Sequence, residues 1–184
     1  MAGTLIPVVG PSGAGKDSLI DAARIARPDI FFPTRVITRP AGAGGEVFKG
    51  VDVPFFQELA GKGAFSFHWQ AHGLFYGIPD DITGALDAGQ HVIFNSSRGI
   101  LDLVRQMYER VQIIVVTAPA DVLAARLVAR GRESVDDIAN RLRRADYAAP
   151  KGADVSIIQN SGTLAQGQAA FLAALPASLL AENA

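Results

Sequence analysis

Short apolar runs alternate with helical patterns along most of the chain. Five runs predict strands, and several of them are nearly continuous in apolar residues, as in strands covered on both faces: residues 5–9, 35–38, 91–94, 111–117 and 155–159. Helical patterns lie between them at residues 16–26, 100–108, 121–130 and 135–147, and a last one begins near Thr163. This order predicts an α/β fold with a central parallel sheet of five strands flanked by helices.

Two regions depart from this alternation. Residues 39–80 combine a glycine-rich loop, a short helix and a hairpin, AFSFHWQAHGLFYGIP, which turns near His72-Gly73. The second region, RGRES at residues 130–134, is a glycine-containing break between two helices. Insertions of this kind carry substrate sites or mobile lids. We therefore expect one domain over residues 1–184, with a binding insertion in the first region and a lid at about 126–145.

Composition narrows the classes of function. The 184 residues are 49% hydrophobic and 19% charged, which suits a folded domain with a real core. A net charge of -1 gives no electrostatic footprint for nucleic acid or for an anionic membrane. There are no cysteines, so disulfides and thiolate metal sites are excluded. Because no apolar run approaches the length of a membrane span, we expect a cytoplasmic protein whose partners are small molecules.

The sequence GPSGAGK, at residues 10–16, is the first candidate for chemistry. It meets the pattern G-x-x-x-x-G-K, follows the apolar strand LIPVV and precedes a helix. Glycines let backbone N–H groups surround a phosphate, and the helix N-terminus adds about half a positive charge. A turn that merely connects a strand to a helix needs fewer glycines and no lysine at this position. The motif predicts an ATP site, in which Lys16 reaches the β- and γ-phosphates, formed by Gly10, Pro11, Ser12, Gly13, Ala14, Gly15, Lys16, Asp17 and Ser18.

Asp17 stands where such loops carry a serine or threonine hydroxyl for magnesium. A carboxylate oxygen is a good Mg²⁺ ligand, so Asp17 could hold this cofactor directly or through a water. An acidic residue in the first helical turn is also stabilised by the helix dipole, so Asp17 could instead do no more than start the helix. Ser18 cannot take over the metal role, because one residue along a helix turns the side chain by about 100°.

Further segments resemble the guanylate kinase family of P-loop kinases. They are ITRP, GEVFKGVD, HGLFYG and LVARGRESVDDIANRLRRA, in the order and spacing of that family. The resemblance implies a P-loop kinase fold with an acceptor-binding insertion and an arginine-rich lid. The polar residues with which guanylate kinases read guanine are replaced here by Val53, Phe67 and Ile78. Because such a site discriminates through its hydrogen-bonding groups, we expect these replacements to abolish guanine recognition.

The same departures resemble a narrower family, the ribose 1,5-bisphosphate phosphokinases of phosphonate degradation. GPSGAGKDSL with its aspartate, WQAHGLFYGIP, the run NSSR at residues 95–98, and RGRES with RLRRA are similar to that family. The resemblance implies transfer of the ATP γ-phosphate to the 1-phosphate of ribose 1,5-bisphosphate, which gives 5-phosphoribosyl 1-diphosphate (PRPP) and ADP. This transfer needs positive charge and exclusion of water rather than a catalytic base, because the acceptor phosphate is already a nucleophile at neutral pH.

Cationic side chains are therefore the main candidates for catalysis. The predicted catalytic residues are Lys16 and two lid arginines that close over the ATP phosphates, Arg130 and Arg141. Because a guanidinium binds phosphate in a bidentate fork, Arg39 is the first candidate for the acceptor phosphate. Arg35, within an apolar run, is interpreted as structural. Asn160 occupies the place where related kinases contact adenine, and the other predicted acceptor contacts are Glu46, Tyr76, Asn95, Ser97 and Arg98.

Two alternative functions stand beside this prediction. One is a guanylate kinase or another nucleoside monophosphate kinase, and the other is a guanylate-kinase-like binding module without catalysis. The lysine loop and the arginine lid argue against the binding module. Trp69 and the phenylalanines near it are assigned to the core of the insertion in preference to stacking on a base. The sequence leaves the oligomeric state open.

Overall fold

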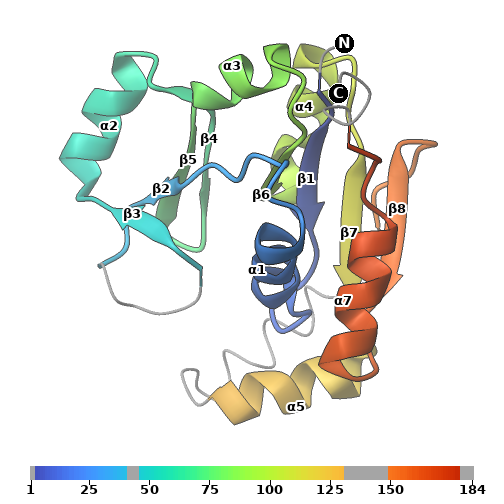
Figure 1. Ribbon diagram of the computed structural model, residues 1–184. Helices are drawn as coiled ribbons and strands as arrows, with labels where there is room; N and C mark the ends of the chain where they lie inside the picture. Colours follow the sequence, from blue (N-terminus) through green and yellow to red (C-terminus); the bar gives the residue numbers. More distant parts are fainter. Residues whose placement is uncertain (1–2, 41–45, 131–148, 179–184) are drawn as a thin grey trace.

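The computed structural model describes residues 3–40, 46–130 and 149–178, apart from the side chain of Arg130. Within these residues a parallel sheet has the order β6-β1-β7-β8, formed by β1 (Leu5–Val9), β6 (Val92–Asn95), β7 (Ile113–Thr117) and β8 (Val155–Gln159). The elements that connect and flank it (Figure 1) are α1 (Lys16–Ala26), α3 (Asp81–Asp87), the 3-10 turn η1 (Arg98–Ile100), α4 (Leu101–Met107), α5 (Ala120–Arg130) and α7 (Leu164–Ala173). The predicted α/β class with a parallel sheet is confirmed.

The prediction of five strands in this sheet is wrong by one. Residues Arg35–Ile37 form β2, which lies in a second sheet of order β3-β2-β5-β4, with β3 (Phe48–Gly50), β4 (Phe65–Ala71) and β5 (Leu74–Pro79). β2 pairs antiparallel with β5 and parallel with β3. An apolar run fits either sheet, and the choice depends on partners distant in sequence. Together with α2 (Val53–Gly61), the second sheet stands beside the parallel sheet, on the left of Figure 1.

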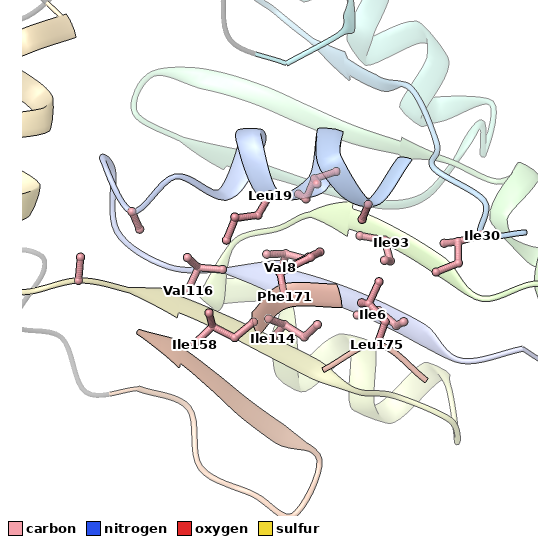
Figure 2. Packing of buried hydrophobic residues seen from close by; sticks show 14 of the residues in the cluster. Ile6, Val8, Leu19, Ile30, Ile93, Ile114, Val116, Ile158, Phe171 and Leu175 are labelled. Atoms are coloured by element: carbon pink, nitrogen blue, oxygen red, sulfur yellow. The ribbon is translucent and has the colours of Figure 1, made fainter. Parts of the chain in front are cut away.

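The parallel sheet is covered on both faces. Successive side chains of a strand point to opposite faces, so in β1 Ile6 and Val8 pack with Leu19 of α1 and Phe171 of α7 (Figure 2). Leu5 belongs instead to a second cluster, shared with α3, η1, α4 and the hairpin of β4 and β5. All five residues of β1 are buried as a result, which explains why this strand reads as a continuous apolar run.

The segment after α7 is tied back to the sheet and to α1. The His91 ring is 3% exposed, and its Nδ1 accepts a hydrogen bond from the Thr4 N–H at 3.1 Å. Nε2 therefore carries the proton and donates to the Ala177 carbonyl oxygen at 2.8 Å. Arg27, at the C-cap of α1, donates to the Pro176 carbonyl oxygen at 3.1 Å.

Arg27 also makes a close ion pair with Asp29. Nη2 lies 2.7 Å from Oδ2 and Nε lies 2.8 Å from Oδ1. The hydrogen bonds from Arg27, which favour the ionised carboxylate, lower the pKa of Asp29 from its ordinary value of 3.8 to about 2. This pair fixes the turn that leads from α1 towards the second sheet.

The hairpin of the insertion was predicted correctly. His72 and Gly73 form its turn with φ of 53° and 75°, the positive values that a two-residue hairpin turn of this hand requires at both positions. The predicted helix at 135–147 lies outside the described residues. Among the helices that are described, none has the combination of length and apolarity needed to cross a membrane.

Candidate active site

The loop at residues 10–15 joins the end of β1 to the start of α1. Lys16 opens the helix, and its Nζ donates to the carbonyl oxygens of Gly10 at 2.8 Å and Pro11 at 3.1 Å, so the ammonium group folds back onto the loop. Gly15 is the N-cap and has no side chain to offer to the N–H groups of the first turn. Backbone donors, the helix dipole and a lysine thus meet at one place, which is the arrangement that binds phosphate.

Two of the loop glycines are required by packing as well. A Cβ at Gly10 would lie 1.9 Å from the carbonyl oxygen of Val116, and one at Gly15 would lie 2.6 Å from Nδ2 of Asn160. Their φ angles are 148° and 90°, which residues with a Cβ rarely adopt. The path of the loop is therefore set by β7 and by the residue after β8, in addition to its own sequence.

The loop lines a pocket of about 530 Å³. Other walls come from the second sheet and from the residues at the end of β6. Predicted site residues that line it are Gly10, Pro11, Ser12, Gly13, Gly15, Lys16, Asp17, Ser18, Arg39, Glu46, Tyr76, Asn95, Ser97 and Arg98. The fold thus brings the predicted phosphate loop and all the predicted acceptor contacts into one space, although they come from distant parts of the chain.

Positive charge exceeds negative charge on the described walls of the pocket. The lining includes four cations and two carboxylates, which are Lys16, Arg35, Arg39, Arg98, Asp17 and Glu46. The guanidinium carbon of Arg39 lies 4.3 Å from the centre of the Phe48 ring, a cation-π distance that orients the side chain. A surplus of oriented cations suits a site that must hold two phosphorylated molecules side by side.

The end of β6 is shaped by two side chains that were predicted to contact the acceptor. Asn95 donates from Nδ2 to Oδ1 of Asp17 at 2.8 Å, which links the sheet to the first turn of α1. The hydroxyl of Ser97 accepts from the Gly99 N–H at 3.3 Å and caps the 3-10 turn that begins at Arg98. This cap fixes the backbone from which Arg98 extends.

No protein-family model matches this chain, but individual known proteins are similar to most of it. The ribose 1,5-bisphosphate phosphokinase PhnN of Rhizobium etli is 44% identical over 183 residues, which cover 98% of this chain and 92% of that protein. The protein of the same name from Agrobacterium fabrum is 47% identical over 163 residues, covering 87% of this chain and 89% of that one. This chain belongs to the ribose 1,5-bisphosphate phosphokinase family.

Some relatives in this comparison are longer. The bifunctional ribose 1,5-bisphosphokinase-thymidine phosphorylase of Cupriavidus pinatubonensis is 45% identical over 176 residues, which cover 95% of this chain and 29% of that protein. The chain therefore spans less than a third of the length of this bifunctional relative.

Two solved structures share the fold. A guanylate kinase from Anaplasma phagocytophilum aligns over 94% of this chain and 86% of its own, with a TM-score of 0.60 and 21% identity. A gluconokinase from Sinorhizobium meliloti aligns over 99% and 95%, with a TM-score of 0.53 and 19% identity. The P-loop kinase fold and the family predicted from the sequence motifs are both confirmed.

The aspartate of the loop has a structural partner. Asp17 lies in the first turn of α1, lines the pocket and accepts the hydrogen bond from Asn95. The described residues contain no group of three or more His, Cys, Asp or Glu side chains that could hold a metal by themselves. A single carboxylate beside a phosphate loop still fits Mg²⁺, because this ion keeps several waters and takes its other ligands from substrate phosphates.

Asn160 lies behind the phosphate loop. Its side chain is 4% exposed, donates from Nδ2 to the Ala14 carbonyl oxygen at 2.8 Å, and does not line the pocket. Ala14 is fully buried and is likewise absent from the pocket lining. The geometry gives both residues a role in holding the loop, whereas direct contact of Asn160 with adenine stays a prediction.

The predicted lid lies largely outside the described residues. α5 ends at Arg130, whose side chain is not described, and Arg141 lies in the undescribed range 131–148. Their assignment as catalytic residues therefore stays a prediction.

Two residues that were not among the predicted site residues also line the pocket. They are Arg35, interpreted as structural, and Trp69, assigned to the core of the insertion, which also packs against the second cluster. Trp69 is paired with Tyr76 across the hairpin and stacks on it with ring centres 5.4 Å apart. Strand alternation gave no signal for Arg35, because β2 ends at Ile37 and Arg39 lies beyond it.

The residues that replace the guanine-reading groups are not on the pocket wall. Phe67 is 1% exposed and Ile78 is fully buried, and both pack with α3 and β6 in the second cluster. Val53 is 41% exposed at the start of α2. At these three positions the described structure offers a base no hydrogen-bonding side chain, in line with the expected loss of guanine recognition.

Proposed function

We propose that this chain is an ATP-dependent ribose 1,5-bisphosphate phosphokinase that produces PRPP and ADP. An oxygen of the 1-phosphate attacks the γ-phosphorus of ATP, and the bond between that phosphorus and the β-γ bridging oxygen breaks as ADP leaves. The observation that carries the proposal is one pocket in which the Lys16 loop is joined by Arg39 and Arg98 from two other segments. The names of the full-length relatives support this acceptor over GMP.

The roles follow from position and chemistry. Lys16 and the loop N–H groups hold the β- and γ-phosphates of ATP, and Arg39 and Arg98 hold the phosphates of the acceptor. The hydroxyls of Tyr76 and Ser97 donate to acceptor phosphate oxygens, while Glu46 and the side chain of Asn95 contact the sugar hydroxyls. Asp52 is given no role at the sugar, because it accepts from the Phe55 N–H at 2.8 Å as the N-cap of α2 and does not line the pocket.

Positioning and charge supply the catalysis. The acceptor phosphate is largely a dianion at neutral pH, so no base has to remove a proton from it. Mg²⁺, bound to Asp17 directly or through a water molecule, would neutralise charge on the β- and γ-phosphates. Arg130 and Arg141 are proposed to neutralise the transferring group. We further propose that residues 1–184 act as one kinase domain in the cytoplasm, with ATP and a sugar bisphosphate as partners.

The test is an acceptor panel. Purified protein with Mg·ATP is given ribose 1,5-bisphosphate, GMP or AMP, and ADP formation is followed while ³¹P NMR identifies the product. We expect the diphosphate signals of PRPP with the sugar bisphosphate and at least ~100-fold lower kcat/KM with either nucleotide. Rapid turnover of GMP with none of the sugar bisphosphate would make the protein a nucleoside monophosphate kinase. Failure to bind Mg·ATP at millimolar concentration would instead favour the binding module.

A further inference from the structure

The guanidinium of Arg35 is a charged group in the interior of the described structure. Arg35 is 6% exposed, although it lies in β2 at the wall of the pocket. Removing an ion from water is costly unless its hydrogen bonds are replaced, so the contacts of this group show what it does.

Those contacts join two parts of the protein. Nε donates to Oε2 of Glu46 at 2.7 Å and Nη2 donates to Oε1, so the pair is bidentate. Nη1 turns the other way and donates to the carbonyl oxygen of Asn95, at the end of β6, at 2.9 Å. The guanidinium carbon also lies 5.4 Å from the centre of the Tyr76 ring. One side chain thus holds the insertion, through Glu46 and Tyr76, against the parallel sheet.

The connection continues to the phosphate loop. The side chain of Asn95 donates to Asp17 in the first turn of α1, so Glu46, Arg35, Asn95 and Asp17 form a continuous line of contacts. We call these four residues the bridge. They line the main pocket and also a smaller cavity of about 20 Å³ behind it. The bridge therefore separates the main pocket from the small cavity. Its geometry depends on its own hydrogen bonds more than on close packing by neighbouring side chains.

We propose that Arg35 is a positioning residue for phosphoryl transfer: it fixes the acceptor-binding face of the insertion at the distance from the phosphate loop that in-line transfer requires. The inference rests on the proposed function insofar as the acceptor occupies this pocket. The three guanidinium nitrogens of Arg35 donate to oxygens of Glu46 and Asn95. Arg35 therefore acts through these two residues. Arg39 and Arg98 remain the arginines assigned to the acceptor phosphates.

The expected size of the effect follows from the chemistry. Misplacing a reacting group by about 1 Å can lower a rate by ~100-fold, even when the altered residue touches neither substrate. Replacing one partner of a buried ion pair also destabilises the fold, because the other charge, here that of Glu46, is left without its partner. Arg35→Met should therefore lose stability as well as rate, and its kinetics are compared with wild type only while the variant is folded.

The test compares Arg35→Met and Arg35→Lys with a matched control, Arg105→Met. Arg105 has the same kind of contacts, with both carboxylate oxygens of Asp154 at 2.8 and 3.0 Å and the Lys151 carbonyl oxygen at 3.0 Å, but it does not line the pocket. Steady-state kinetics at a temperature well below each Tm give kcat and the KM for each substrate. The acceptor used is whichever one the wild type turns over in the acceptor panel, so a failed sugar assignment leaves this test intact.

We expect Arg35→Met to lower kcat by ~100-fold and to raise the KM of the acceptor at least ~5-fold, with the KM of ATP within about twofold of wild type. Arg35→Lys should restore little, because one ammonium cannot reach both Glu46 and the Asn95 carbonyl. Arg105→Met should match wild type. If Arg35→Met fails to fold, Arg35→Lys alone decides the question by the same kinetic constants.

Equal kinetics for Arg35→Met and wild type would overturn the inference, as would full rescue by lysine. An equal rise in both KM values would also contradict it, because a positioning role at the acceptor face predicts a selective change. A wild type that turns over no acceptor would overturn it together with the proposed function.

Discussion

Replacing Asn160 with alanine tests how the phosphate loop is held in place. In the structure this side chain is wedged between the loop and α7, since a Cβ at Gly167 would lie 2.3 Å from its Oδ1 and its Nδ2 donates to Ala14. Asn160→Ala removes the donor from a carbonyl on a fully buried residue. The variant should therefore lose stability and also loosen the loop.

The magnitude comes from the lost hydrogen bond and the space left behind. A buried acceptor that loses its donor costs about 1–3 kcal/mol, so we expect the free energy of unfolding to fall by ~2 kcal/mol. For a chain of this size each kcal/mol lowers Tm by roughly 2–4 °C, which gives a fall of roughly 4–8 °C. Asn160→Asp, which keeps the shape but cannot donate, should fall at least as far.

Thermal denaturation followed by circular dichroism measures this loss, with Gln159→Ala as the control. Gln159 is the preceding residue, is exposed and does not line the pocket. Kinetics with ATP and GTP complete the assay. Loosening the loop should raise the KM of both nucleotides alike, because the loop contacts phosphates that the two share.

A different result would refute this reasoning. An unchanged Tm together with a tenfold change in the preference for ATP over GTP would mean that Asn160 reads the base. The hydrogen bond to Ala14 would then carry no measurable stability, and the adenine contact predicted from the sequence would be favoured.

Two further predictions concern charge. Lys16→Ala should lower kcat at least ~100-fold while the protein still folds, because Lys16 acts on phosphates and supports no core; ADP formation and thermal melts measure this. Asp29→Asn should lower the free energy of unfolding by ~1 kcal/mol at pH 7, measured by urea denaturation. Because the folded state holds the pKa of Asp29 at about 2, below 3.8, its contribution is present above pH 4 and is lost as the pH falls towards 2.

Each of these predictions has a control and an opposing result. Lys62→Ala removes an exposed lysine paired with Glu58 and should leave turnover unchanged. Wild-type turnover in a folded Lys16→Ala variant would contradict the role of the lysine. For Asp29, a stability difference between variant and wild type that stays constant from pH 7 to pH 2 would mean that the ion pair with Arg27 does not stabilise the fold.

Some elements could be predicted from sequence because their own residues decide them. β1, α1 and β8 have the predicted bounds. In α1 the apolar residues at helical spacing, Leu19, Ile20 and Ala23, are the buried ones. A strand covered on both faces and an amphipathic helix each leave a complete local pattern, and no distant partner is needed to interpret it.

Other elements depend on contacts that no local pattern contains. β2 is an apolar run, and its place in the second sheet is decided by pairing with residues about 40 positions away, such as Val36 with Gly77. Helix α3 was not predicted, since its seven residues with Gly84 at the centre give a weak helical pattern. Its burial against β6 supplies what the local sequence lacks.

The candidate site was predicted where residues follow the ends of strands. Asn95, Ser97 and Arg98 line the pocket as expected for the carboxyl end of a parallel strand. Arg35 was interpreted as structural, and its burial and its hydrogen bonds to Glu46 and Asn95 agree with that role, but its place on the pocket wall was not predicted. Its contacts with Glu46 and Asn95 arise from the way the two sheets meet, which the sequence does not state.

The tight fit of Gly10 under the Val116 carbonyl oxygen has a practical consequence for anyone who wants an inactive form of this protein. Mutating the glycines of a nucleotide loop is a common way to abolish binding. Here the methyl group of a Gly10→Ala variant would clash with strand β7. The substitution would therefore disturb the fold as well as the phosphate site. Loss of activity in such a variant would therefore not measure the contribution of the loop to phosphate binding. A substitution at Lys16 removes the phosphate-binding ammonium group and leaves β7 undisturbed. Lys16→Ala is therefore the more suitable inactive variant of this chain.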